Sequence, residues 1–322
     1  MPKVSVVMPV HNREMHVGDA IQSILDQTFH DWELLLINDA STDATKEIIE
    51  GYASQDTRIK VVNLDQNIGV SGARNIGHEL AKGTYIAVLD SDDLAHPNRL
   101  ARQVDYLEQH KQVVLVSSDT QYIGYHTHLH SPPPTNQSAQ VTLLKGNCYV
   151  HSSLMLRHDT LKKHAISYQS GYDTAEDYRL ITQMANVGKL ARIPEILVTY
   201  LTHNNQLSVS HADIQSNHAH RIRLAYWQAA FPNLSIDLEA LTNLFIPQTN
   251  RLSIKIATDQ VRLCVQTNAL SGRFDGRLFW DLAVEMMRTV INQNGCVYHP
   301  LAWWGWQVNP YPFYKKWHSR LG

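Results

Sequence analysis

The chain has 322 residues, 43% of them apolar, which is enough to bury a sizeable core in one large or two small domains. Its formal net charge of −2 gives no reason to expect a nucleic-acid partner. The apolar stretches are too short to span a bilayer, and the first residues lack the pattern of a signal peptide. Three widely separated cysteines, Cys148, Cys264 and Cys296, form neither a disulfide framework nor a zinc pattern. We therefore expect a cytoplasmic protein.

Strand and helix signals alternate through the first part of the chain. Apolar, β-rich runs predict strands, and apolar residues at helical spacing predict the helices between them. The expected strands are 4–8, 34–37, 59–62, 85–89 and 113–117, and the expected helices are 17–25, 44–52, 73–81 and one that begins near Pro97. This alternation predicts an α/β fold with a mostly parallel, twisted sheet flanked by helices on both faces.

The alternation loosens after residue 118. The later expected elements are a proline-containing loop or flap at 126–140, a strand at 152–156, a helix at 175–187 and an extended segment at 190–201 that is broken at Pro194. Helical signals dominate from about residue 210. We therefore expect a main domain over 1–209 and a helical C-terminal region over 210–322.

Acidic residues follow two of the predicted strands. Asp90, Asp92 and Asp93 come directly after the strand at 85–89, and Asp39 follows the strand at 34–37. Ligands of a parallel sheet bind beyond the carboxyl ends of its strands. Carboxylate oxygens there suit Mg²⁺ or Mn²⁺, which usually shares its coordination shell with substrate phosphates. Taken alone, an acidic turn is explained equally well by a helix N-terminus, with Asp93 as its cap.

Three further features bear on function. Asp39 is placed to accept a hydrogen bond from the imide N–H of uracil or thymine. Polar residues replace an apolar run at 9–14, as is typical where a strand ends at a nucleotide. Glu176 and Asp177 open a predicted helix, where carboxylates suit the helix dipole and where one of them is equally able to act as a general base.

Four segments together resemble the inverting glycosyltransferase family 2, which has the GT-A fold. They are Val4-Ser5-Val6-Val7-Met8-Pro9-Val10-His11-Asn12, Leu36-Ile37-Asn38-Asp39-Ala40-Ser41-Thr42-Asp43, Asn67-Ile68-Gly69-Val70-Ser71-Gly72-Ala73-Arg74-Asn75 and Leu89-Asp90-Ser91-Asp92-Asp93. Their order and spacing match over roughly 3–118, and more loosely to about 205. His11 departs from the usual Tyr of the family, and Asn38 and Ala40 replace the usual Asp and Gly.

The resemblance implies a role for individual residues. For the donor nucleotide it implies Pro9, His11, Glu14, Asp39, Arg74, Asp90 and Ser91. For the metal it implies Asp92, joined by His203, which is explained equally well as a diphosphate contact or a loop histidine. It implies Asp177 as the catalytic base, with Glu176 and His151 near the acceptor. Arg74 has an alternative reading as a surface or salt-bridged arginine. By this resemblance, 1–118 is a Rossmann-like half that binds the nucleotide sugar, and 119–209 carries the acceptor and the base.

The resemblance also implies a reaction. It is the inverting, Mn²⁺- or Mg²⁺-dependent transfer of one sugar from a nucleotide diphosphate sugar, a uridine diphosphate sugar by our expectation, to a saccharide or lipid-linked saccharide acceptor. The chain lacks the Gln-x-x-Arg-Trp motif and the membrane helices of polymerising relatives, so a single transfer in surface-glycan assembly (lipopolysaccharide or capsule) is expected. The alternative is a catalytically degenerate nucleotide-sugar-binding module. A nicotinamide enzyme is excluded because no Gly-x-Gly-x-x-Gly follows the first strand.

The tail is aromatic and basic. Its residues are Trp303, Trp304, Trp306, Tyr311, Phe313, Tyr314, Lys315, Lys316, Trp317 and Arg320. Such a mixture suits a peripheral contact with the inner face of the cytoplasmic membrane. It is equally consistent with rings that pack the helical region onto the main domain, and both readings stay open at this point.

Overall fold

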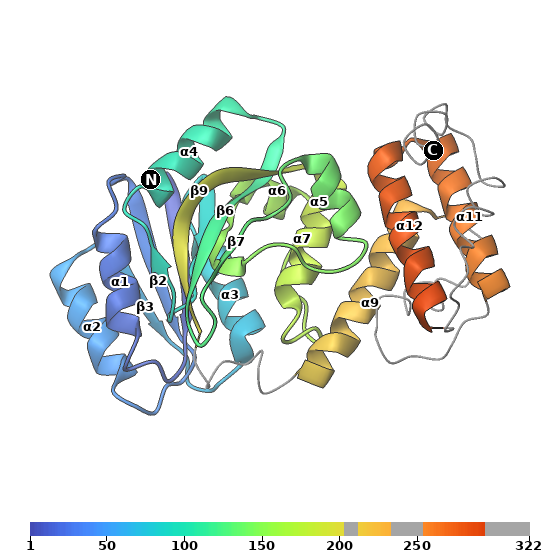
Figure 1. Ribbon diagram of the computed structural model, residues 1–322. Helices are drawn as coiled ribbons and strands as arrows, with labels where there is room; N and C mark the ends of the chain where they lie inside the picture. The colour runs from blue at the N-terminus through green and yellow to red at the C-terminus, as the bar shows by residue number, and fades with distance from the viewer. Residues whose placement is uncertain (203–211, 233–253, 294–322) are drawn as a thin grey trace. The chain divides into compact units, whose positions relative to one another are not determined.

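The computed structural model describes residues 1–202, 212–232 and 254–293 (Figure 1). The chain divides into two units: the first comprises 1–139 and 147–219, and the second comprises 140–146 and 220–322. The first unit therefore continues past the expected boundary at residue 209. The aromatic tail lies outside the described residues. Among the described helices, none combines the length and the apolar character needed to cross a membrane.

One curled sheet forms the centre of the first unit. Its strands are β1 (Val4–Val10), β2 (Trp32–Asn38), β3 (Ile59–Asn63), β4 (Tyr85–Val88), β5 (Leu94–Ala95), β6 (Val113–Gly124), β7 (His128–His130), β8 (Met155–Arg157) and β9 (Lys189–Thr202). They lie in the order β3-β2-β1-β4-β8-β6-β9-β5, and β7 pairs with β6. The run β3-β2-β1-β4 is parallel, and so is β6 with β9, whereas β8 is antiparallel to both of its neighbours. The predicted mostly parallel sheet is confirmed.

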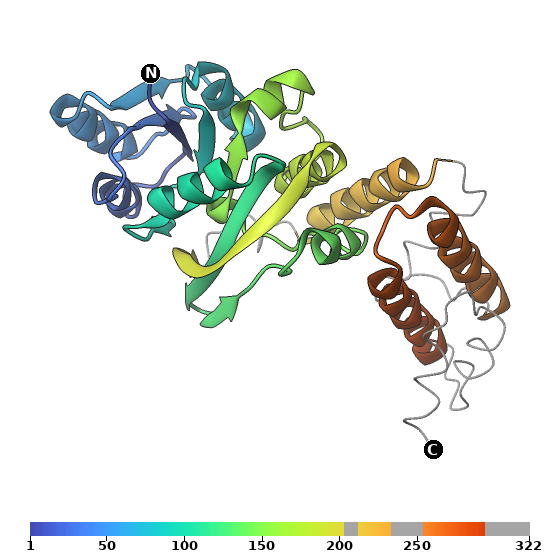
Figure 2. The ribbon, with the colours of Figure 1, turned by 90° about the horizontal axis from the view of Figure 1, so that it is seen from above.

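The helices connect and flank these strands. They are α1 (Val17–Leu25), α2 (Thr45–Gln55), α3 (Gly69–Leu80), α4 (Arg99–Gln109), α5 (Asn136–Thr142), α6 (His158–Lys163) and α7 (Glu176–Val187). Helix α9 (Ala212–Ala230) begins in the first unit, and α11 (Ile254–Ser271) and α12 (Gly276–Gln293) belong to the second. Figures 1 and 2 show the long strands β6 and β9 side by side.

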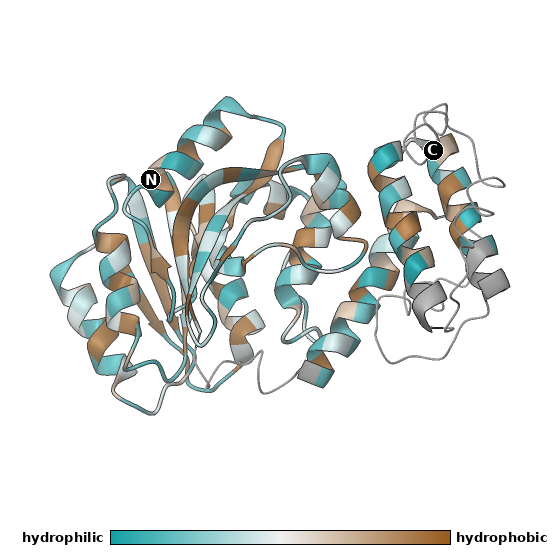
Figure 3. Ribbon diagram, in the orientation of Figure 1, coloured by the Kyte–Doolittle hydropathy of each residue, from teal (hydrophilic) through white to brown (hydrophobic). Residues whose placement is uncertain are grey.

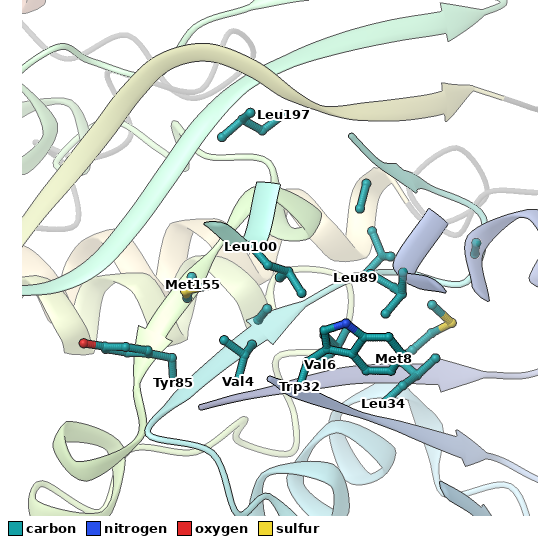
Figure 4. Close-up of a cluster of buried hydrophobic side chains, with 14 of the residues drawn as sticks. Val4, Val6, Met8, Trp32, Leu34, Tyr85, Leu89, Leu100, Met155 and Leu197 are labelled. Carbon is teal, nitrogen blue, oxygen red and sulfur yellow. The ribbon is translucent and has the colours of Figure 1, made fainter. Parts of the chain in front are cut away.

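The core explains why α1 and β1 form where they do. The apolar stripe of α1 (Val17, Ala20, Ile21 and Ile24) is buried in the same cluster as alternate residues of β1 (Val4, Val6, Met8 and Val10). Figure 4 shows part of this cluster, and Figure 3 shows helices that alternate between apolar and hydrophilic residues. Every residue of β1 is buried, as expected for a parallel strand that is covered on both faces.

Helix α3 covers the opposite face of β1 and β2. A Cβ atom on Gly77 would lie 2.4 Å from a methyl group of Val7, so this glycine lets the helix approach the strand closely. The helix begins at Gly69, earlier than the predicted start at residue 73. Its first N–H groups are satisfied from outside the helix, because Asp39 accepts from Ile68 and Asn67 accepts from Gly69. With these donors satisfied, the helix extends through the glycine segment.

Three later elements also differ from the expectations. The predicted strand 152–156 is instead a 3₁₀ turn at His151–Ser153 followed by β8, because Ser152 turns inward. The expected loop at 126–140 contains β7 and the start of α5. Pro194 does not break β9. The register jumps from Ser118↔Ile193 to Asp119↔Ile196, so the proline lies in a bulge where it donates no hydrogen bond.

Candidate active site

A cleft of about 510 Å³ opens at the carboxyl ends of the central strands of the first unit. Of the residues predicted for the site, the cleft is lined by Pro9, His11, Asp39, Arg74, Asp90, Ser91, Asp92, His151, Glu176 and Asp177. Glu14 is not among the lining residues, and His203 lies outside the described residues. The sheet thus brings together side chains that are up to 168 positions apart, from residue 9 to residue 177.

The ends of β1 and β2 are tied together by hydrogen bonds. His11 Nδ1 lies 2.8 Å from the backbone oxygen of Asp39, and Asp39 Oδ1 accepts from the backbone N–H of Ile68 at 2.7 Å. Asp39 is only 3% exposed, so its carboxylate has a fixed orientation at the cleft wall. Ala40 adopts a φ of +55°, a left-handed conformation that costs a non-glycine residue about 1–2 kcal/mol.

Glu14 has a different environment from the predicted one. Its carboxylate accepts a hydrogen bond from the backbone N–H of Ala44 at 2.9 Å. Asp43 next to it accepts from the N–H groups of Thr45 and Glu14. Both acidic residues therefore satisfy backbone donors around the start of α2, a position where negative charge is favoured. The structure gives Glu14 this helix-capping contact and no place in the cleft.

Arg74 lies at the centre of a buried ion-pair network. It is 4% exposed, and its two terminal nitrogens lie 2.6 Å from Asp90 Oδ1 and 2.6 Å from Glu176 Oε1. Burial alone would lower the pKa of Arg74, but the two carboxylates outweigh it and raise that pKa. The guanidinium therefore remains charged. It joins the turn after β4, which carries Asp90, to the helix that carries Glu176, so Arg74 is salt-bridged and also lines the cleft.

Asp90 is held as a carboxylate by this network. Burial would raise its pKa, yet the Arg74 guanidinium and His151 bring it well below its ordinary value. His151 Nδ1 lies 3.8 Å from Asp90 Oδ1, and the other ring nitrogen lies 2.8 Å from the hydroxyl of Tyr168. His151 is buried beside Asp90, and both side chains line the cleft.

Asp92 and Asp93 point to different places. Asp92 lines the cleft, and its Oδ2 lies 3.3 Å from Nε of Arg13. Asp93 is fully buried and accepts hydrogen bonds from the Ser152 hydroxyl and from the backbone N–H of Leu201. The interpretation of Asp93 as a helix cap is therefore wrong. Burial, followed by the charges of Asp92 and Asp90, raises the pKa of Asp93 well above its ordinary value.

Asp177 stands in the first turn of α7. Its Oδ1 accepts from the backbone N–H of Tyr178 at 2.6 Å, and its Oδ2 accepts from the side-chain amide of Asn147 at 2.8 Å. Burial, and then the neighbouring charge of Glu176, raises the pKa of Asp177 to about 6. A carboxylate with this pKa is largely ionised at neutral pH, yet it is more basic than an ordinary aspartate.

Replacing Asn147 by Ala is expected to raise the pKa of Asp177 by about one unit, because the ionised form loses a hydrogen-bond donor. Asn147 is exposed, so the protein should tolerate the change. The pKa is measured by NMR titration of the side-chain ¹³C carboxyl signals. Asn98→Ala, at an exposed asparagine before α4, is the matched control and should leave that pKa unchanged. If the pKa of Asp177 were the same in Asn147→Ala and Asn98→Ala, the hydrogen bond from Asn147 would not affect Asp177.

The oxygen donors of the cleft fit a divalent cation that shares its ligands with a substrate. Within residues 1–202, 212–232 and 254–293, no three His, Cys, Asp or Glu side chains gather into a ligand cluster. Mg²⁺ and Mn²⁺ do not require such a cluster, because they are often bound by one or two carboxylates together with substrate phosphates. Asp92 is the carboxylate best placed for this role, since Asp90 is engaged by Arg74 and Asp93 is buried.

Comparison with known proteins identifies the family. The model of glycosyl transferase family 2 matches residues 5–164. An uncharacterized glycosyltransferase of Methanocaldococcus jannaschii is 30% identical over 234 residues, which are 70% of this chain and 80% of that protein. The chain belongs to glycosyltransferase family 2. The predicted family and the predicted enzyme class are thereby confirmed.

Two solved structures share the fold of this family 2 glycosyltransferase. S. aureus TarS (residues 1–349), in complex with UDP-GlcNAc, has a TM-score of 0.59 and 17% identity, over 92% of this chain and 93% of that chain. The mannosyltransferase PcManGT from Pyrobaculum calidifontis, in complex with GDP-Man and Mn²⁺, has a TM-score of 0.57 and 14% identity, over 91% and 87%. The predicted GT-A fold is confirmed by the first of these likenesses.

Residues that the motifs did not predict also line the cleft of this glycosyltransferase or contact its lining residues. Asn147, which holds the carboxylate of Asp177, follows a glycine in an unremarkable polar turn. Tyr122 and Tyr200 line the cleft from positions near the ends of two long strands, β6 and β9. Their positions depend on how β6, β7 and β9 pair, and local sequence carries no signal for that pairing.

Proposed function

We propose that this enzyme transfers one sugar, with inversion of the anomeric configuration, from a uridine diphosphate sugar to a saccharide or lipid-linked saccharide acceptor. The observation that carries the proposal is the carboxylate of Asp177. It lines the same cleft as Asp92 and has a pKa of about 6. One group is thus suited to accept a proton and the other to hold a metal ion at the donor.

Asp177 would act as the general base. Its carboxylate takes the proton of the acceptor hydroxyl while that oxygen attacks the anomeric carbon of the donor sugar. The bond to the diphosphate breaks on the opposite face, so the configuration inverts in one displacement. A base works best when its pKa lies near the working pH, and the raised pKa of Asp177 meets this condition.

The donor would lie along the ends of β1, β2 and β4. Asp39 is fixed at the wall of the cleft, where its carboxylate would accept a hydrogen bond from the imide N–H of uracil. Guanine carries an N–H donor too, so the base is a question for experiment. When bound, Mn²⁺ or Mg²⁺ supplies Lewis-acid stabilisation to the leaving diphosphate, and Asp92 would hold it. Arg74 keeps Asp90 ionised and in place beside it.

The acceptor is proposed to be a growing surface glycan. The support is membership of glycosyltransferase family 2, together with a cleft that is lined by polar side chains. A catalytically degenerate module would not be expected to keep the base and the metal carboxylate in one cleft. Release of nucleoside diphosphate, assayed with a panel of UDP- and GDP-sugars, separates these two possibilities.

Asp92→Ala is expected to lower Mn²⁺-dependent release of nucleoside diphosphate about 10²- to 10³-fold, because the cation loses its protein ligand. The assay runs with Mn²⁺ and with EDTA. Asp19→Ala, at an exposed carboxylate on α1, is the matched control and should keep full activity. If both variants released the product at the same rate, the metal assignment would be wrong. The anomeric configuration of the product, read by ¹H NMR, tests inversion directly.

A further inference from the structure

Three strands bring an aromatic ladder to the cleft. Tyr122 on β6 lies in register with His128 on β7 and with Tyr200 on β9. Side chains at such paired positions point to the same face of a sheet. The ring centroids of Tyr122 and His128 are 4.3 Å apart and the rings are stacked, and those of Tyr122 and Tyr200 are 4.7 Å apart. The ring of Tyr122 is therefore held from both sides.

Both tyrosine hydroxyls are affected by carboxylates of the site. Tyr122 and Tyr200 both line the cleft. Burial raises the pKa of Tyr122 to about 12, with Asp93 and Asp177 as the contributing charges. Burial also raises the pKa of Tyr200, where the carboxylate charges are those of Asp93, Asp90 and Asp92. Asp177 is thus among the charges that act on Tyr122, and Asp90 and Asp92 are among those that act on Tyr200.

Both phenols are protonated at neutral pH, so each can donate and accept a hydrogen bond. In the part of the chain that the structure describes, neither hydroxyl has a hydrogen-bond partner. Both tyrosines line the cleft, so a ligand rich in hydroxyl groups can exchange hydrogen bonds with them there. A sugar ring is a ligand of this kind.

The outer end of the ladder is open. His128 is exposed and belongs to β7, a short strand that pairs only with β6 among the described strands. The ring contacts therefore run from Tyr200, through Tyr122, to an exposed imidazole at the edge of the sheet. A ligand that enters from this edge reaches Tyr122 before it reaches Tyr200.

We propose that Tyr122 and His128 form the subsite for the acceptor sugar. The Tyr122 hydroxyl hydrogen-bonds a hydroxyl of the terminal pyranose and directs the neighbouring hydroxyl toward Asp177, and His128 contacts the same sugar or the one behind it. The inference rests on the proposed function, since it takes Asp177 as the group that receives the acceptor proton. It deepens that function by naming where the acceptor binds and which side chains select it.

Binding of a panel of methyl hexopyranosides and methyl N-acetylhexosaminides to the UDP-loaded protein tests the subsite. Saturation-transfer NMR gives the affinities. Tyr122→Phe, which removes only the hydroxyl, is expected to weaken the preferred glycoside about 10-fold, and His128→Ala about 3-fold. Leu129→Ala alters an exposed residue on the opposite face of the same strand and should bind the glycoside as the wild type does. Isothermal titration with UDP checks that each variant is folded.

Two results would overturn the subsite: no glycoside binds the wild type, or Tyr122→Phe binds it with unchanged affinity. The test is independent of the proposed base. If Asp177→Asn kept its transfer rate while Tyr122→Phe lost glycoside binding, the base would be wrong and the subsite would stand. If Asp177→Asn abolished transfer while Tyr122→Phe bound normally, only the subsite would fail.

Discussion

Replacing Arg74 by Met is expected to lower the free energy of unfolding by about 3–5 kcal/mol, the typical cost of breaking a buried ion pair from one side. The change leaves two carboxylates, Asp90 and Glu176, in the interior without the cation that lies 2.6 Å from each. Urea denaturation measures the effect. Because the two carboxylates then repel each other, the transfer rate should fall as well.

A second arginine variant shows how much of the destabilisation comes from the burial of the ion pair. Arg102 pairs with Glu195 on the surface, so Arg102→Met should cost less than about 1 kcal/mol. Adding Glu176→Gln to Arg74→Met removes one of the stranded charges and should restore part of the lost stability. If Arg74→Met and Arg102→Met unfolded at the same urea concentration, the buried ion-pair network would not contribute the stability predicted for it.

Asp177→Asn is expected to lower the transfer rate about 10²- to 10⁴-fold, the usual contribution of a general base. In the wild type, the base must be ionised, so the rate should rise with pH and level off above a pKa of about 6. The steady-state rate of diphosphate release across the pH range measures both effects. Glu47→Gln, on the surface of α2, is the control and should keep the wild-type rate and pH profile.

Asp177→Asn should increase the stability of the protein at neutral pH, although it lowers the transfer rate. Folding raises the pKa of Asp177 from 3.8 to about 6. The folded state therefore binds more protons than the unfolded state in that window, and stability falls as the pH rises through it. At pH 7 the Asn variant should be more stable by about 1–2 kcal/mol, less than the full shift implies because the side chain is partly exposed. A variant with full activity and unchanged stability would refute the assignment of Asp177.

The elements that the sequence predicted well are those with dense local patterns. The apolar run of β1 and the spaced apolar residues of α1 specify both their type and their buried faces. The acidic residues after β2 and β4 line the cleft at the carboxyl ends of the strands, because these ends lie at the same edge of a parallel sheet. A motif at a strand end therefore predicts its position in space as well as its residue types.

The structure adds most at positions where distant segments decide the contacts of a side chain. Asp93 and Glu14 have the appearance of site residues, but Ser152 and Leu201 engage the first, and Ala44 engages the second. Tyr122 enters the cleft only because β6 pairs with β7 and β9. None of these partners lies within the window that a helix or strand pattern covers. The roles of such residues depend on tertiary pairing, which a single sequence does not display.

The position of β8 between β4 and β6 has a consequence for how the protein is made. Strand β4 pairs with β8 through Tyr85↔Arg157, so its outer edge stays open on the ribosome until residue 157 has emerged. An open edge of an apolar strand invites pairing with other chains. A fragment that ends at residue 118 would retain this edge, so we expect it to aggregate more readily than the complete first unit. Exchange of halves between related enzymes should therefore be made after residue 157, where the sheet has already closed around β4.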